Sequence, residues 1–172
     1  MHSYVIGATR SGKTNYLLSL AEGAFCFIDK HGEAARQLAD SRKCIYWRPA
    51  DLSHPIGLNP LFNVPPDDRW KVTADIVSVF SDIWKLGPET PRLLYYLRAA
   101  VRLLLDTQGS TLLEIRRVLS DDSYRARQLR KCTDTQTRLT WLEYNAKDAR
   151  QQSQEIGSLQ NKVAALQARC SD

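Results

Sequence analysis

Hydrophobic residues are arranged differently in the two parts of this chain. The first part contains short unbroken apolar runs, which lie at residues 4–6, 24–28 and 44–47. Runs of this length suit strands that are buried on both faces, so they predict three strands of a parallel sheet. Helical spacing of the apolar residues in 15–21, and a short segment over 33–38, predict helices between these strands. We therefore expect residues 1–64 to form an α/β unit.

From Asp67 onward the pattern becomes helical and stays so. One apolar stripe consists of Val72, Ile76, Val79, Phe80, Ile83 and Trp84. Residues 93–105 are apolar nearly all round, which is typical of the central helix of a bundle. Pro65 and Pro66 mark the boundary, and Asn59-Pro60-Leu61 just before them predicts a turn. We expect residues 65–172 to form an α-helical bundle.

Local signals mark where helices of this bundle begin. Thr111 and Glu114 have the spacing of a capping box, which predicts a short helix through Leu119, and Asp121-Asp122 predicts the cap of another. Two further apolar series at helical spacing are Leu139, Leu142, Ala146 and Ala149, then Leu159, Val163 and Leu166. The predicted fold class is thus α/β: a partial sheet followed by an all-helical bundle.

The motif with the clearest chemistry is Gly7-Ala8-Thr9-Arg10-Ser11-Gly12-Lys13-Thr14, which matches G-x-x-x-x-G-K-[ST]. It lies between a predicted strand and a predicted helix, as a P-loop does. Glycines let the backbone bend tightly so that main-chain N–H groups surround a polyphosphate. We expect Lys13 to reach the β- and γ-phosphates of ATP and the Thr14 hydroxyl to bind Mg²⁺. The candidate nucleotide-binding residues are Gly7, Ala8, Thr9, Arg10, Ser11, Gly12, Lys13, Thr14 and Asn15.

Hydrolysis of ATP also needs groups that orient water and stabilise the transition state. Asp29 and Glu33 are the carboxylates expected near the ends of the predicted strands, and with Lys13 they are the candidate catalytic residues. Each has a structural alternative: Asp29 as a cap of the following turn, and Glu33 as an acidic residue in the first turn of a helix. His31 between them would sense nucleotide or lie in solvent.

Composition and cysteine usage add a few limits. The 172 residues are 43% hydrophobic and carry a net charge of +5, which mildly favours an anionic partner. A basic group consists of Arg116, Arg117, Arg125, Arg127, Arg130 and Lys131, and it would follow a phosphate backbone or form a solvated helix face. Cys26, Cys44, Cys132 and Cys170 are widely spaced, which indicates free thiols in a reducing cytoplasm. We expect neither a signal peptide nor a membrane span.

Several segments in order resemble the HerA/FtsK superfamily of P-loop ATPases, in its HerA-like and conjugative coupling-protein branch. They are the P-loop at residues 4–14, Phe27-Ile28-Asp29-Lys30-His31-Gly32-Glu33, Asn59-Pro60-Leu61 and Leu159-Gln160-Asn161-Lys162. Lys30 stands where the branch usually has proline. The resemblance implies that the predicted sheet is part of a P-loop NTPase sheet, RecA-like. It also implies the amino-terminal portion of a hexameric, ATP-driven motor that moves double-stranded DNA and works with a nuclease or with secretion machinery.

The chain departs from that family after the bundle segment. No strand ending in Asp-Glu follows it, and no candidate arginine finger is evident. ATP hydrolysis would then depend on catalytic parts supplied downstream or by a neighbour. Two alternatives stay open: a small P-loop kinase, and a non-hydrolysing nucleotide-binding adaptor that recruits a partner through its helical bundle.

Overall fold

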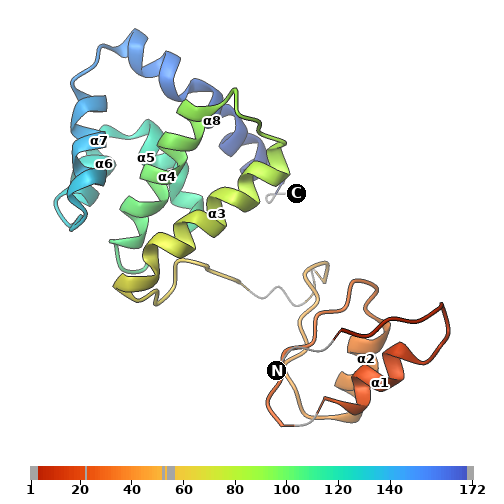
Figure 1. Cartoon of the computed structure of the whole chain (residues 1–172). Coiled ribbons are helices and arrows are strands. Elements are labelled where there is room, and N and C mark those ends of the chain that lie inside the picture. Colours follow the sequence, from red (N-terminus) through yellow and green to blue (C-terminus); the bar gives the residue numbers. More distant parts are fainter. Residues whose placement is uncertain (1–3, 22, 52, 54–56, 170–172) are drawn as a thin grey trace. The chain divides into compact units, whose positions relative to one another are not determined.

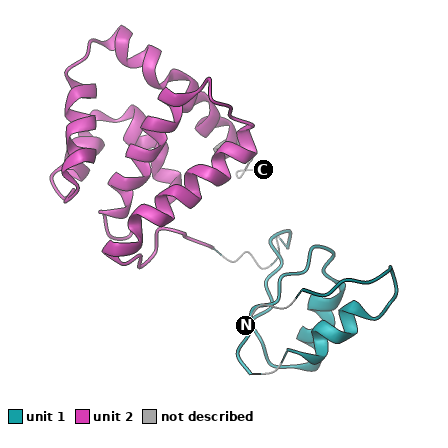
Figure 2. Ribbon diagram, in the orientation of Figure 1, with its two compact units in different colours: residues 1–57 teal, residues 58–172 magenta. Residues whose placement is uncertain are grey.

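The chain divides into two compact units, Met1–Gly57 and Leu58–Asp172, which Figure 2 shows in different colours. A computed structural model describes residues 4–21, 23–51, 53 and 57–169. Each unit has its own set of helices and is described by itself.

The described residues of the first unit form two short helices in contact with each other, α1 (Lys13–Ser19) and α2 (Glu33–Ser41) (Figure 1). Each is preceded by a glycine in the left-handed conformation, Gly12 at φ 87° and Gly32 at φ 83°. Glycine adopts this geometry without the steric cost that a Cβ would impose. The two helices predicted from the sequence pattern are therefore confirmed.

The predicted sheet is wrong. The described residues form no strand, and residues 4–6, 24–28 and 44–47 have an irregular backbone. Tyr4, Ile6, Ile28 and Ile45 are between 81% and 94% exposed. A strand is stable only when neighbours satisfy its backbone groups and one face is buried. Among the described residues of this unit, the buried apolar ones are Ala21, Ala34 and Leu38, which offer the three runs little to pack against.

The second unit is all-helical over its described residues (Figure 1). Its elements are η1 (Pro66–Asp68), α3 (Arg69–Trp84), α4 (Pro91–Leu105), η2 (Leu112–Glu114), α5 (Ile115–Ser120), α6 (Asp122–Leu129), α7 (Thr135–Asn145) and α8 (Ala149–Arg169). Helix α4 packs against α3, α5, α6, α7 and α8, which confirms the prediction of a central helix. Because it touches neighbours on most sides, nearly all of its apolar side chains are buried.

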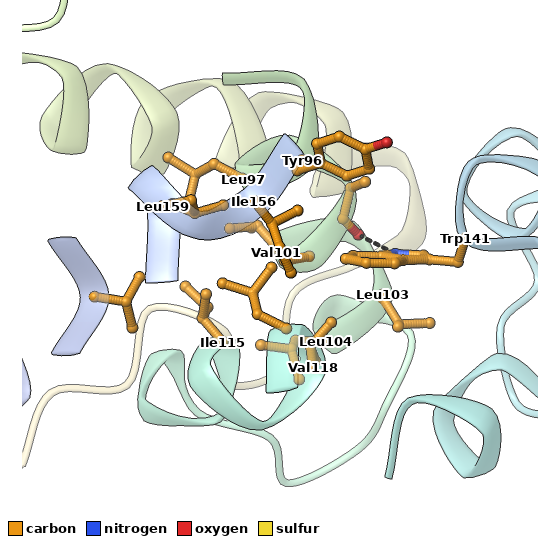
Figure 3. Close-up of a cluster of buried hydrophobic side chains, with 14 of the residues drawn as sticks. Tyr96, Leu97, Val101, Leu103, Leu104, Ile115, Val118, Trp141, Ile156 and Leu159 are labelled. Carbon is orange, nitrogen blue, oxygen red and sulfur yellow. Dashed lines mark hydrogen bonds between the residues drawn. The ribbon is translucent and has the colours of Figure 1, made fainter. Parts of the chain in front are cut away.

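The core of this unit is built around α4, and Figure 3 shows its centre. Leu97, Val101 and Leu104 are fully buried, and Ile156 and Leu159 of α8 pack in the same cluster. The indole N–H of Trp141 on α7 donates a hydrogen bond to the carbonyl oxygen of Ala99 at 3.3 Å (Figure 3). A large ring is therefore buried without leaving its polar atom unpaired.

Polar side chains define the helix starts, as the sequence predicts. Thr111 and Glu114 form a reciprocal capping box at η2. The carboxylate of Asp121 accepts a hydrogen bond from the amide of Tyr124 at 2.8 Å and caps α6. These bonds satisfy amides that have no partner within their own helix.

The predicted turn at Asn59 is also confirmed, and it belongs to the second unit. The Asn59 side chain accepts a hydrogen bond from the amide of Leu61 at 3.1 Å and donates one to the carbonyl oxygen of Ser110 at 2.8 Å. Leu61 is buried in the core. The asparagine therefore joins the start of this unit to the segment before η2.

Helix α7 buries a different face from the one that its leucines suggest. Thr137, Thr140, Trp141 and Tyr144 are buried, whereas Leu139 and Leu142 are 47% and 55% exposed. The aromatic residues fit against α4, so side-chain size and shape outweigh the spacing of the leucines.

Cys26, Cys44 and Cys132 are free thiols, as expected, and Cys170 lies outside the described residues. No helix in the described part of the chain is long and apolar enough to cross a membrane.

Candidate functional site

The glycine motif forms a curled loop that leads into α1. The amide of Ser11 donates a hydrogen bond to the carbonyl oxygen of Ala8 at 3.2 Å, which closes a turn. Arg10 and Gly12 have positive φ angles of 67° and 87°. These conformations reverse the chain direction just before Lys13 begins the helix.

The side chain of Lys13 folds back over this loop. Its Nζ atom donates hydrogen bonds to the carbonyl oxygens of Gly7 at 2.7 Å and Ala8 at 2.6 Å. An ammonium group has three donor hydrogens, so one remains for another acceptor. The side chain thus holds a positive charge beside the exposed backbone of the loop.

The first glycine of the motif lies close to the side chain of Ser11. A Cβ atom on Gly7 would lie 2.4 Å from the Oγ atom of Ser11, a distance that real Cβ contacts do not show. Because this Oγ atom is the end of a side chain that can rotate, a larger residue at position 7 would require Ser11 to adopt another rotamer. The positive φ of Gly12 is the stronger requirement for glycine in this loop.

The remaining motif residues surround the loop in exposed positions. Thr14 and Asn15 lie in the first turn of α1, and Thr9 and Arg10 lie in the turn before it. No group of three or more His, Cys, Asp or Glu side chains that could hold a metal occurs among the described residues. A magnesium ion often keeps several waters and binds through few protein groups plus phosphates, so a single Thr14 hydroxyl fits that role.

The carboxylate of Asp29 accepts hydrogen bonds from backbone amides that follow it in the chain. One carboxylate oxygen accepts from the amide of His31 at 3.0 Å, and the other accepts from the amides of Ala34 at 2.9 Å and Ala35 at 3.2 Å. These bonds, with that from His31 the strongest, hold the pKa of Asp29 below its ordinary value. The geometry is that of a carboxylate capping the first turn of α2.

Glu33 and His31 make no bond to the glycine motif among the described residues. Glu33 is exposed in the first turn of α2, where a negative charge is favoured by the helix dipole. The His31 side chain is also exposed. None of the hydrogen bonds or ion pairs formed by the described residues joins Asp29 or Glu33 to residues 7–14.

The residues of the basic group in the second unit differ in burial: Arg125 is buried, and the others are exposed. The Arg125 side chain is only 1% exposed, and its guanidinium lies 5.0 Å from the ring centroid of Tyr144. It donates to the carbonyl oxygen of Val118 at 2.8 Å and to the side chain of Asn145 at 3.0 Å. Arg125 is therefore part of the core, and the sequence gives no signal that separates it from its neighbours.

The other basic residues of that group are exposed on α5, α6 and the segment after α6. Arg117 lies over the ring of Tyr124 at 4.2 Å from the centroid, and Arg127 lies near the same ring at 5.8 Å. Such contacts orient guanidinium groups at a surface.

Comparisons with protein-family models, curated proteins and solved structures found no match to this chain.

Proposed function

We propose that the loop formed by Gly7 to Thr14 binds ATP together with Mg²⁺. The observation that carries this proposal is the position of the Lys13 ammonium group, 2.6–2.7 Å from two carbonyl oxygens of the same glycine loop. A lysine held over a curled, exposed backbone places positive charge where main-chain amides are also accessible. This arrangement suits a polyphosphate better than a neutral ligand.

The roles of the side chains follow from their chemistry. Lys13 would bind phosphate oxygens, and the Thr14 hydroxyl would be a ligand of the metal ion, whose charge offsets that of the triphosphate. Gly12 gives the loop its left-handed backbone conformation, and Gly7 leaves room for the Ser11 side chain. Ala8, Thr9, Arg10, Ser11 and Asn15 are the remaining candidate contacts.

The hydrogen bonds to Asp29 support a function in which this chain binds ATP but does not hydrolyse it by itself. Both of its oxygens already accept backbone hydrogen bonds, so the carboxylate is poorly placed to accept a proton from water. This observation supports the second candidate function, a nucleotide-binding adaptor. The DNA-translocating motor and its hexameric ring stay predictions of the resemblance. The cytoplasmic location stays a prediction from the cysteines, and no observation favours the kinase.

Titration with a fluorescent ATP analogue tests the proposal. Lys13→Ala should weaken binding by about 10- to 100-fold, because a charge-assisted hydrogen bond contributes about 1.5–3 kcal/mol. Lys30→Ala is the matched control, since Lys30 is an exposed lysine of the same unit outside the loop. Thr14→Ala should reduce the effect of Mg²⁺ on affinity. Equal binding by wild type and Lys13→Ala would contradict the proposal.

A turnover assay separates the two candidate functions. Phosphate release should be absent with ATP alone if the chain is an adaptor. Release that rises with added double-stranded DNA, and is lost in Lys13→Ala, would instead support the motor.

A further inference from the structure

One flank of α3 carries an apolar row that the second unit leaves partly exposed. The helix packs on α4 through Thr73, Ile76 and Val77, which are buried. Val79 and Ile83 are 55% and 56% exposed. Together with the half-buried Val72 they have the spacing i, i+7 and i+11, which places them along one line of the helix. We call Val72, Val79 and Ile83 the outer row.

The outer row begins in a groove. A cavity of about 360 Å³ lies between residues 62–65 and the start of α3, and it is open to solvent. Phe62, Val64 and Val72 supply its apolar surface, and Phe62 is 75% exposed. A contiguous apolar surface with an open groove at one end is a feature of interaction sites.

An acidic row runs beside the outer row. Asp68, Asp75 and Asp82 are spaced seven residues apart and are exposed, and each lies three or four residues from Val72 or Val79. None of the ion pairs formed by the described residues involves these three carboxylates. Lys71 is the basic side chain that also lines the groove, so negative charge predominates.

We propose that the outer row and the acidic row bind an amphipathic helix of a partner protein, with apolar side chains at heptad spacing and Lys or Arg along one flank. Heptad-spaced rows match the ridges of a second helix. The 16 residues of α3 offer a contact line of about 24 Å. A basic flank would pair with the acidic row and fix the orientation of the partner.

The charge of the acidic row argues against other occupants. Nucleic acid and anionic membranes would bring negative charge against three carboxylates. A symmetric antiparallel pair of two copies through α3 would place the acidic rows opposite each other, since an isologous contact uses the same patch twice. The partner helix of opposite charge is therefore the occupant that the surface favours.

The probe is a synthetic amphipathic peptide of about 18 residues with leucines at heptad positions and lysines on one flank. Its acidic twin has glutamates in place of the lysines. Binding of each labelled peptide to the full chain is measured by fluorescence anisotropy, and backbone amide shifts in NMR spectra locate the contact. We expect the basic peptide to bind and to shift amides of α3.

Charge reversal gives the sharpest comparison. Asp75→Lys/Asp82→Lys should lower the affinity for the basic peptide by about tenfold or more. The same variant should bind the acidic twin more tightly than wild type does. Asp40→Lys/Glu143→Lys is the control with the same change of charge, made at exposed acidic residues on α2 and α7. The control variant should still bind the basic peptide more tightly than the acidic twin, as wild type does.

Removal of the apolar contacts is the second arm. Val79→Ser/Ile83→Ser should lower the affinity for the basic peptide. Leu139→Ser/Leu142→Ser, on the exposed face of α7, should leave that affinity unchanged. Circular dichroism melts check that all variants fold. The proposal is overturned if the peptide does not bind, if the shifted amides lie outside α3 and residues 62–65, or if variants and controls behave alike. Concentration-dependent self-association that Val79→Ser/Ile83→Ser abolishes would also overturn it.

Discussion

The two units of this chain differ in content: one has a candidate phosphate-binding motif, and the other has an extended hydrophobic core. The first contains the glycine motif, but the buried apolar side chains at its described positions are Ala21, Ala34 and Leu38. The second has an extended core around α4 and lacks a comparable phosphate-binding motif. Apolar burial is the main source of folding free energy, whereas a phosphate loop needs mainly local backbone geometry. Candidate chemistry and stability thus reside in different parts of the molecule.

Truncation of a core aromatic residue should give the largest effect. Trp141→Ala removes a side chain that is 0% exposed and packs against α4, and we expect a loss of about 3–5 kcal/mol in unfolding free energy. Ile45→Ala, at a side chain that is 94% exposed in the first unit, should change it little. Urea unfolding followed by far-ultraviolet circular dichroism measures both. Similar losses in the two variants would break the contrast between the units.

Replacement of the buried arginine should have the next largest effect. Arg125→Met leaves the buried carbonyl oxygen of Val118 without this donor, at a cost of about 1–3 kcal/mol, whereas the exposed Asn145 can hydrogen-bond to water instead. The exposed neighbour Arg127→Met is the control. The same unfolding experiment would show an equal stability of the two variants if Arg125 were a surface residue.

The second unit should also lose stability at low pH. Burial alone would raise the pKa of Asp106, but hydrogen bonds from the amides of Thr133 and Asp134 and from neighbouring side chains outweigh it and lower the pKa. A lowered pKa means that the unfolded state binds the proton more tightly. The stabilising contribution is therefore complete above the ordinary value of 3.8 and is lost as the pH falls below it.

Asp106→Asn should flatten this dependence. Thermal melts between about pH 2 and pH 7 should show a smaller decrease in the midpoint for the variant than for wild type. Glu155 has a lowered pKa because hydrogen bonds from Lys147 and Tyr96 outweigh the effect of burial, so part of the dependence should remain. If the melting midpoint of Asp106→Asn depended on pH as strongly as that of wild type, this carboxylate would not contribute to the pH dependence of stability.

The smallest effect concerns the first unit. Asp29→Ala removes the acceptor for the amides of Ala34 and Ala35, so hydrogen exchange at these amides should accelerate. Glu33→Ala is the control, because Glu33 makes no such bond among the described residues. If ATP hydrolysis were found and were lost in Asp29→Ala with no change in exchange, a catalytic role would replace the capping role.

The sequence by itself determined the local features. Capping residues such as Thr111 and Asp121, the turn at Asn59 and the glycine before α1 act through neighbours a few residues away, and the structure contains each of them. The apolar character of α4 likewise predicted its central position, because a helix that is apolar on most sides has to be buried.

Only the tertiary structure decided which segments are buried together. The apolar runs at 4–6, 24–28 and 44–47 have strand-like composition, but strands form through pairing with distant segments, which local pattern does not encode. The leucines of α7 have core-like spacing, yet Trp141 and Tyr144 occupy the core. Arg125 is buried although it belongs to a basic series. In each case close packing with residues far away in the chain outweighs the local pattern.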